Sequence, residues 1–246
     1  MLVSIIVPVY ILNEELLSLT EATFESLQQT EWDGEQVELI LVDDGSSVGQ
    51  NFLKVHSDIY IRGSVNHGYP WAVNKGIKVS SGELLLISNN DVRVSSNWLK
   101  VAKEIFAQDH KVGSVHFRMI EYDQPIELGN DTWITGKERW CHGSFYVIRR
   151  EALPEGLYDE NYGLGGYDDY DLQYRLRKAG WVTAYTNKAV FQHKDSSTQL
   201  LRDSTERRQS DIKNREYFKQ KFGEYPDLLF EKTFIDQMAV PWKPFP

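Results

Sequence analysis

The sequence predicts an α/β fold, a Rossmann-like and mostly parallel central sheet flanked by helices. Three observations predict it. Short apolar runs alternate with amphipathic helical stretches in the first half, which is typical of βαβ units. The apolar runs are rich in β-branched residues and almost unbroken, as expected of strands buried on both faces. Several of them end abruptly in Asn or Asp, at the edge where open α/β sheets bind ligands.

Composition limits the class of protein. The 246 residues are 41% hydrophobic and 26% charged, which suits one large or two small globular domains. A net charge of −9 argues against a nucleic-acid binder, which needs a basic surface. Cys141 is the single cysteine, so we expect no internal disulfide and a reducing compartment. We expect a cytoplasmic protein, because the sequence shows neither a signal peptide nor an apolar run of ~20 residues.

The first strand is predicted at Val3–Val9, with Pro8 near its end because proline lacks an N–H. Asn13 is the expected N-cap of the following helix, with Glu14 and Glu15 in its first turn. The inward face of that helix is predicted to comprise Leu16, Thr23, Phe24 and Leu27.

The second strand is predicted at 37–42, and Asp43 and Asp44 follow it directly, before Gly45. This pattern indicates either a turn or a site where one carboxylate accepts N–H hydrogen bonds from a nucleobase or sugar. A short third strand is expected at 59–62, and a helix from residue 70 to 78.

The next strand, at 83–87, ends in Asn89, Asn90 and Asp91. These oxygen donors suit a hard divalent cation shared with a substrate phosphate, although a strand-ending turn is the alternative. Ser95 or Ser96 is expected to cap the helix whose apolar face contains Trp98, Val101, Ala102, Ile105 and Phe106. The first half contains neither G-x-G-x-x-G nor a P-loop motif, which argues against a dinucleotide oxidoreductase or an NTPase.

The second half is predicted to contain strands at 112–117, 143–148, 182–186 and 189–192, the last followed by His193. A lone histidine is usually structural, so the residues alone leave its role open. Adjacent side chains on a strand point to opposite faces, which argues against a catalytic pair of Cys141 and His142.

The strongest candidate for acid/base chemistry is an acidic cluster, Asp168-Asp169-Tyr170-Asp171, which follows the glycine-rich residues 163–166. Acids in the first turn and bases in the last predict a helix that ends at Gly180. Asp171 and Arg175 have the spacing of an ion pair. Three acids exceed the need of a cap, and like charges this close should raise at least one carboxyl pKa.

The C-terminal region differs in charge from the rest of the chain. Residues 202–221 contain seven Lys or Arg against four Asp or Glu, an excess of +3. This indicates either a solvated helix face or a surface for an anionic partner. The tail from Tyr225 is rich in Phe, Leu, Trp and Pro, and we expect it to pack on the same domain or on a second subunit.

Four motifs, taken in order, resemble the inverting glycosyltransferases of family 2, most of all rhamnosyltransferase-like and galactofuranosyltransferase-like members. The resemblance covers roughly residues 3–195 and is carried by Val7-Pro8-Val9-Tyr10, Val42-Asp43-Asp44-Gly45-Ser46, Asn89-Asn90-Asp91 and Asp168-Asp169-Tyr170-Asp171. It implies the GT-A fold with a small acceptor-side sheet. It also implies transfer of a sugar from a UDP- or dTDP-sugar to a hydroxyl of a glycan or lipid-linked acceptor.

The resemblance divides the chain and assigns its site. Residues 1–110 would be the donor half, 111–200 the catalytic half, and 201–246 a C-terminal helix and tail. The implied donor-binding residues are Pro8, Val9, Tyr10, Asp43, Asn74, Asn89 and Asn90. The implied ligands of a divalent cation, Mn²⁺ or Mg²⁺, are Asp91, Asn89 and His193. Asp169 would be the general base, and the acceptor side would include Trp140, His142, Gly143 and Asp168.

The sequence departs from the family pattern at three positions. Asn89 replaces the first metal-binding acid, Val73 replaces a frequently basic residue before Asn74, and Ile11 follows Tyr10 where Asn is usual. The first departure favours one alternative, a non-catalytic carbohydrate-binding protein on a transferase scaffold. A sugar nucleotidyltransferase is the other, although it should carry a Gly- and basic-rich loop after the first strand. The sequence leaves open whether the protein contacts the inner face of a membrane and whether it forms a homo-oligomer.

Overall fold

The structure, a computed structural model, describes residues 1–135, 141–155, 157–194 and 203–226. Its strands are β1 (Leu2–Val9), β2 (Gln36–Asp43), β3 (Ile59–Arg62), β4 (Leu84–Ser88), β5 (Val92–Val94), β6 (Val112–Glu121), β7 (Thr132–Thr135), β8 (Phe145–Arg149) and β9 (Val182–His193). Its α-helices are α1 (Glu14–Gln28), α2 (Gln50–Val55), α3 (Tyr69–Val79), α4 (Trp98–Gln108), α5 (Asp168–Lys178) and α6 (Ser204–Phe222).

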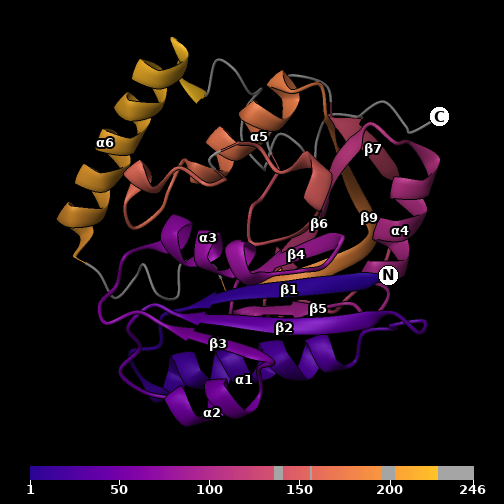
Figure 1. The fold of residues 1–246 in the computed structure, drawn as a ribbon, viewed down its shortest axis with the longest axis horizontal. Helices are drawn as coiled ribbons and strands as arrows, with labels where there is room; N and C mark the ends of the chain where they lie inside the picture. The colour runs from indigo at the N-terminus through magenta and orange to yellow at the C-terminus, as the bar shows by residue number, and fades with distance from the viewer. Residues whose placement is uncertain (136–140, 156, 195–202, 227–246) are drawn as a thin grey trace.

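All the strands join one nine-stranded sheet, in the order β3-β2-β1-β4-β8-β6-β9-β5, with β7 paired to β9 (Figure 1). The strands β1 to β4 pair in parallel with one another, as their unbroken apolar sequences predict. Val9 lies opposite Asp43 in this register, so the polar residues that follow β1 and β2 meet at one edge. The predicted α/β class with a central sheet flanked by helices is confirmed.

The second half continues the same sheet with mixed directions. β8 is antiparallel to β4 and β6, β6 is parallel to β9, and β5 and β7 are antiparallel to β9. The prediction of two strands at 182–186 and 189–192 is wrong, because β9 continues through a register shift opposite Phe117 and Arg118. β5, β7 and α2 were not predicted, since each is six residues or shorter.

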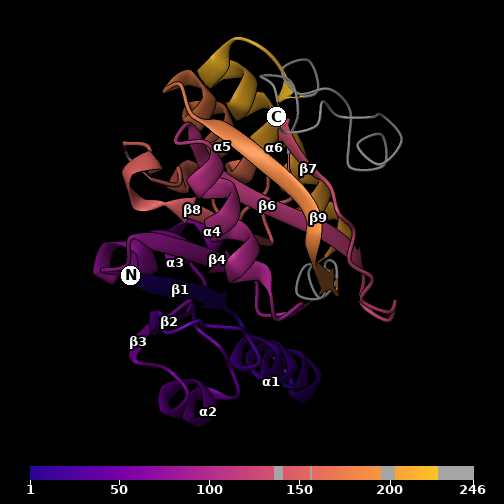
Figure 2. The same ribbon diagram turned by 90° about the vertical axis from the view of Figure 1, so that its right-hand side faces the viewer.

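Helices cover both faces of the sheet (Figures 1 and 2). One core cluster contains buried side chains of α1, α2 and α4, among them Phe24, Leu53 and Trp98. The other contains side chains of α3 and α5, among them Ile77 and Leu172. α6 lies outside both clusters and is fixed by Phe218, which is fully buried in a separate aromatic cluster.

Two predicted helix caps have different outcomes. Asn13 caps α1, because its Oδ1 accepts a hydrogen bond from the Leu16 N–H at 2.9 Å. The prediction that Ser95 or Ser96 caps α4 is wrong, since α4 begins after Asn97 and without a side-chain cap. The Ser95 hydroxyl instead accepts a hydrogen bond from the Val190 N–H at 3.1 Å and so ties the start of α4 to β9.

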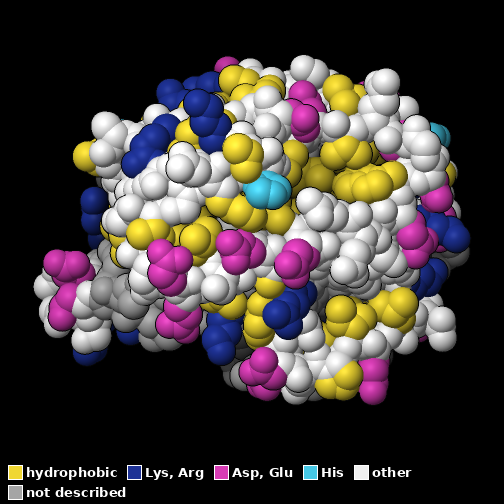
Figure 3. All heavy atoms as spheres, turned by 90° about the horizontal axis from the view of Figure 1, so that it is seen from below, with side chains coloured by type: hydrophobic (Ala, Val, Ile, Leu, Met, Phe, Trp, Pro, Cys, Tyr) yellow, Lys and Arg dark blue, Asp and Glu magenta, His cyan; other side chains and the backbone are white. Residues whose placement is uncertain are grey.

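The surface on the side of α1 and α2 carries acidic and basic side chains scattered among hydrophobic ones (Figure 3). A continuous basic surface, which a nucleic-acid binder needs, is absent from the face that this view shows. Within the described residues, every helix is too short or too polar to cross a bilayer.

Candidate functional site

The carboxyl ends of β1 and β2 are joined by hydrogen bonds that fix the segment after each strand. The Asp44 N–H donates to the Val9 carbonyl at 2.9 Å, and the Ser47 N–H donates to the Ile11 carbonyl at 2.7 Å. The Ser46 hydroxyl accepts from the Ile11 N–H at 2.9 Å. The end of β1 therefore lies beside residues 43–47, at the edge where the predicted donor-binding residues Pro8, Val9 and Tyr10 meet Asp43.

Asp43 is fully buried, and its carboxylate already accepts three hydrogen bonds. The donors are the Ser46 N–H at 2.8 Å, the Tyr60 hydroxyl at 2.6 Å and the Arg62 guanidinium. Sequence reasoning missed Tyr60 and Arg62, although Arg62 pairs with Asp43 in the β2–β3 register. The Arg62 side chain is 41% exposed and lies between Asp43 and solvent, so a nucleobase at this edge would meet both groups.

Asp44 fixes the loop that leads into α3. Its Oδ2 accepts from the N–H groups of His67 and Gly68 at 2.8 and 2.7 Å. Its Oδ1 lies 2.8 Å from Nδ1 of His67, whose ring stacks on Trp71 with centroids 4.1 Å apart. Sequence reasoning gave no role to His67 or Trp71, since their pairing depends on where this loop folds.

Two predicted donor-binding side chains point into the protein. Asn74 is buried, and its amide makes hydrogen bonds with both the N–H and the carbonyl of Tyr158, each at 2.9 Å, and with Glu160 at 2.8 Å. The Asn90 amide donates to the Thr20 hydroxyl on α1 at 2.9 Å. We therefore assign both side chains to holding neighbouring segments together rather than to donor contact.

The predicted metal ligands come together where β4 and β9 end and β5 begins. Asp91 Oδ1 lies 3.1 Å from His193 Nε2, and the Asn89 Nδ2 lies 3.3 Å from the same nitrogen. Val92 pairs directly with His193 across β5 and β9, which brings Asp91 to this point. The described residues contain no cluster of three or more His, Cys, Asp or Glu side chains able to hold a metal. One carboxylate, one imidazole and one amide thus form the donor set.

This donor set fits Mg²⁺ or Mn²⁺ that keeps several ligand positions for water or phosphate, because both ions accept oxygen and Mn²⁺ accepts imidazole as well. Asn89 would have to turn its amide so that the oxygen faces the ion, a rotation that leaves the shape of the side chain unchanged. Burial and the nearby His193 lower the pKa of His142 to about 3, so the His142 ring is neutral. It lies against His193, with ring centroids 5.4 Å apart.

The acidic cluster that begins α5 separates into three environments. Asp168 is buried and its Oδ1 accepts from the Gly166 N–H at 2.6 Å. Burial, more than the charge of Asp171, raises its carboxyl pKa to about 6, whereas the sequence suggested like charges as the cause. Asp171 is fully buried and pairs with Arg175 at 2.5 Å, as predicted. The residue before α5 is Tyr167, which has a left-handed conformation and makes no side-chain cap.

Asp169 is the partly exposed member of the cluster, and it faces Gly143. A Cβ placed on Gly143 would lie 2.9 Å from the Asp169 Cβ and 3.1 Å from its Oδ2. The Tyr69 hydroxyl donates to the Gly143 carbonyl at 3.4 Å. Burial first, and then Tyr146, Asp168, Asp169 and Asp91, raise the pKa of Tyr69 well above its usual value.

Tyr69 thus contacts the backbone of Gly143, whose neighbour Ser144 accepts the Asn89 N–H at 2.7 Å through its carbonyl. Sequence reasoning missed it, because an aromatic residue at a helix start carries no functional signal of its own. Trp140, predicted on the acceptor side, lies outside the described residues. Of the remaining acceptor-side predictions, His142 lies against His193, Gly143 lies against Asp169, and Asp168 is the buried neighbour of Asp169.

Comparison with known proteins gives a family match. The profile of glycosyl transferase family 2 matches residues 4–160, which include the metal-ligand motif but end before α5. The cellulose synthase catalytic subunit (UDP-forming) of Komagataeibacter sucrofermentans is 26% identical over 216 residues, covering 74% of this chain and 27% of that protein. This chain therefore spans about a quarter of that relative's length.

A second relative and a solved structure agree with this match. The N-acetylglucosaminyl-diphospho-decaprenol L-rhamnosyltransferase of Mycobacterium tuberculosis is 43% identical over 61 residues, 24% of this chain and 20% of that protein. A mannosyltransferase from Pyrobaculum calidifontis, solved with GDP-Man and Mn²⁺, superposes with a TM-score of 0.65 at 19% identity. The superposition covers 92% of this chain and 66% of that one, and it shows a shared fold.

Proposed function

This chain belongs to glycosyl transferase family 2, and from that premise we propose that it is a metal-dependent inverting glycosyltransferase. It moves a sugar from a UDP- or dTDP-sugar to a hydroxyl of a glycan or lipid-linked acceptor. One observation carries the proposal: the metal-ligand set and Asp169 meet at residues 143–144, because the Ser144 carbonyl accepts the Asn89 N–H at 2.7 Å and Gly143 faces Asp169. A leaving-group site and a base site can therefore face one bound sugar from two sides.

Asp91, His193 and Asn89 would hold the divalent cation. Bound there, Mn²⁺ or Mg²⁺ would neutralise the negative charge that develops on the departing diphosphate. His193 can act as a ligand only when neutral, and its Nε2 lies 3.1 Å from the Asp91 oxygen, so both atoms can reach one cation.

Asp169 would be the general base. Its Oδ1 accepts the Tyr170 N–H at 2.9 Å, which orients the carboxylate, and its Oδ2 faces Gly143. A hydroxyl between Gly143 and Oδ2 would transfer its proton to Oδ2 as its oxygen attacks the anomeric carbon. Attack on the face opposite to the leaving diphosphate is a single displacement, so the anomeric configuration inverts.

The donor base would bind at Asp43 and Arg62, next to Tyr10. An ionised carboxylate offers about four lone-pair sites, and Asp43 uses three within the protein. The remaining site suits the N3–H of uracil or thymine, which adenine lacks. The UDP-forming cellulose synthase relative agrees with this choice, whereas the mannosyltransferase of similar fold binds GDP-Man.

The acceptor is the least determined substrate. The mycobacterial relative is named for a diphospho-decaprenol acceptor, which supports a lipid-linked diphosphate. Such an acceptor is anionic, and the basic excess of residues 202–221, which includes Arg207 and Arg208, suits it. We retain residues 1–110 as the donor half and 111–200 as the catalytic half.

The experiment that tests the function is a thermal-shift panel of UDP-, dTDP-, GDP- and ADP-sugars with and without Mn²⁺, followed by a nucleotide-release assay. Ligand at ~100 times Kd stabilises a protein by about 2.7 kcal/mol, which the melting temperature reports. Mn²⁺-dependent stabilisation and release of UDP or dTDP are expected. Binding without turnover would favour the carbohydrate-binding alternative, to which the replacement of an acid by Asn89 also points. Synthesis of a nucleotide sugar from a nucleoside triphosphate and a sugar phosphate would indicate a nucleotidyltransferase.

A further inference from the structure

The segment before the general base has an unusual backbone. Residues 159–171, here called the strap, follow β8 within the catalytic half and lead into the first turn of α5. Gly163, Gly165, Gly166 and Tyr167 all have positive φ, at 61°, 115°, 95° and 70°. Tyr167 carries a side chain, for which the left-handed region is unfavourable. A conformation of this kind persists only where neighbouring structure holds it.

A single buried amide on α6 supplies that support. Asn214 is 2% exposed, and its Nδ2 lies 3.0 Å from each of three strap carbonyls, those of Tyr162, Gly165 and Gly166. Buried carbonyl groups without a partner are costly. The Tyr162 carbonyl also accepts the Gly165 N–H at 3.3 Å, and Asn214 supplies a side-chain donor that all three strap carbonyls share.

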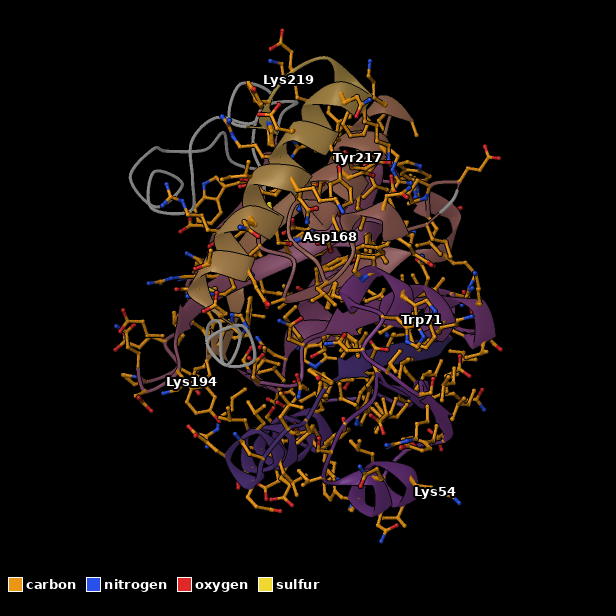
Figure 4. All side chains as sticks on the ribbon, turned by 90° about the vertical axis from the view of Figure 1, so that its left-hand side faces the viewer. Lys54, Trp71, Asp168, Lys194, Tyr217 and Lys219 are labelled. Carbon is orange, nitrogen blue, oxygen red and sulfur yellow. The ribbon has the colours of Figure 1, made fainter. Side chains whose placement is uncertain are left out.

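Other α6 side chains bind the two ends of the strap. The Lys221 ammonium contacts Asp159 at 2.5 Å and Asp171 at 2.6 Å. The Tyr217 hydroxyl donates to Asp159 at 2.9 Å. Phe218 is fully buried in one aromatic cluster with Tyr162. Figure 4 shows Tyr217 on α6 and Asp168 at the start of α5 on the same side of the molecule.

These contacts lead directly to the proposed base. Asn214 fixes the Gly166 carbonyl, the Gly166 N–H donates to Asp168 at 2.6 Å, and Asp169 is the next residue. We infer that Asn214 is a positioning residue for the transfer reaction and that α6 is part of the catalytic machinery. It sets the distance between Asp169 and Gly143. Asn214 lies beyond residues 4–160, where the family match ends, and the inference rests on the proposed function of Asp169.

The test compares Asn214→Ala and Asn214→Asp with wild type in the whole chain. Asp has nearly the shape of Asn but no N–H to donate, so it isolates the three hydrogen bonds. Gln209→Ala, at an exposed and uncharged residue of the same helix, is the matched surface control. Ile105→Val, a core truncation in α4, controls for lost stability alone. The probes are UDP and UDP-sugars with Mn²⁺, nucleotide release from those sugars, and hydrogen–deuterium exchange of residues 163–171.

In both Asn214 variants the amide hydrogens of residues 163–171 should exchange at least ten-fold faster than in wild type. The kcat should fall by ~10²-fold, because small displacements of catalytic groups have effects of this size. The Kd for UDP should stay within two-fold, and both controls should keep wild-type kcat. Unchanged exchange, or a kcat loss that Ile105→Val shares at equal melting temperature, would overturn the inference. If wild type releases no nucleotide, the proposed function fails, and the exchange result alone decides whether Asn214 holds the strap.

Discussion

Asp91 Oδ1 lies 3.1 Å from Nε2 of His193, and the two residues reach this point from different strands of the sheet. The antiparallel pairing of β5 with β9 brings them together, because Val92 lies directly opposite His193. The Lys194 N–H also donates to the Asp91 carbonyl at 3.0 Å, which fixes the backbone on both sides. A preorganised carboxylate and imidazole of this kind need no rearrangement of the backbone to bind a cation.

Removal of either ligand should affect metal and donor together. Asp91→Ala should abolish the Mn²⁺-dependent thermal stabilisation by UDP, because it removes the only carboxylate of the donor set. His193→Ala should weaken that stabilisation by ~10- to 100-fold in apparent Mn²⁺ affinity, as imidazole is a neutral ligand that water can replace. Isothermal titration with Mn²⁺ and UDP measures both effects. Full turnover in the presence of EDTA would show that neither residue serves a metal.

Gly143→Ala tests whether turnover depends on the close approach of Gly143 to Asp169. The added Cβ would lie 2.9 Å from the Asp169 Cβ, a distance that real Cβ atoms do not tolerate, so one segment must move. We expect kcat to fall by ~10²-fold, since the base is displaced from its substrate. Donor Kd, measured on the same variant, should stay unchanged because residues 8–10 and 43 lie on other strands. Normal kcat would mean that the acceptor does not bind between these residues.

The sequence predicted the elements whose signal is local. Asn13 was identified as a cap and residues 83–87 as a buried strand, because caps and apolar runs are read within a few positions. Metal and base residues were proposed from polar side chains that follow strands or begin a helix. The partners that reach across the fold were missed. Arg62 reaches Asp43 only through strand pairing, and Asn214 reaches the strap only after α6 has packed.

Local pattern did not reveal that the Asn74 and Asn90 amides have hydrogen-bond partners within the protein. Both are polar residues beside a motif, so they read as ligand-binding, yet each finds its hydrogen-bond partners within the protein. A buried amide must satisfy its donors and acceptor wherever the fold places it. Only tertiary structure decides whether that partner is a substrate or a neighbouring segment.

The raised carboxyl pKa of Asp168 predicts a pH-dependent stability. In the folded state this pKa rises from 3.8 to about 6, so between these values the folded protein retains a proton that the unfolded chain has lost. The free energy of unfolding should therefore decrease as pH rises through this window. Asp168→Asn keeps an oxygen for the Gly166 N–H and has no charge to bury. It should be more stable than wild type at pH 7 by on the order of 2 kcal/mol, a difference that vanishes below pH ~4.

Urea denaturation of wild type and Asp168→Asn from pH 4 to pH 7 measures this difference. Other titrating groups, such as Asp159, affect both proteins equally and cancel in the comparison. Parallel curves for the two proteins across the whole range would show that the Asp168 carboxyl has its ordinary pKa in the folded protein.

Asp169→Asn is the decisive test of the proposed base. The amide keeps the size of the side chain and can still accept the Tyr170 N–H through its oxygen, but it cannot take a proton. We expect kcat to fall by on the order of 10²–10⁴, the usual contribution of a general base, with donor Kd nearly intact. Nucleotide release from the best UDP- or dTDP-sugar, at saturating acceptor, measures the loss.

Asp171→Asn separates this chemical effect from a structural one, since it changes a carboxylate two residues away on the same helix. Asp171 is fully buried between Arg175 and Lys221, at 2.5 and 2.6 Å, and holds α5 against α6. Loss of its charge leaves both cations with a weaker partner, which should lower the free energy of unfolding by on the order of 2 kcal/mol. Turnover of the folded Asp171→Asn protein should then exceed that of Asp169→Asn by at least ten-fold. Near-normal turnover by Asp169→Asn would place the base elsewhere, because an Asn at that position has no means of accepting the acceptor's proton.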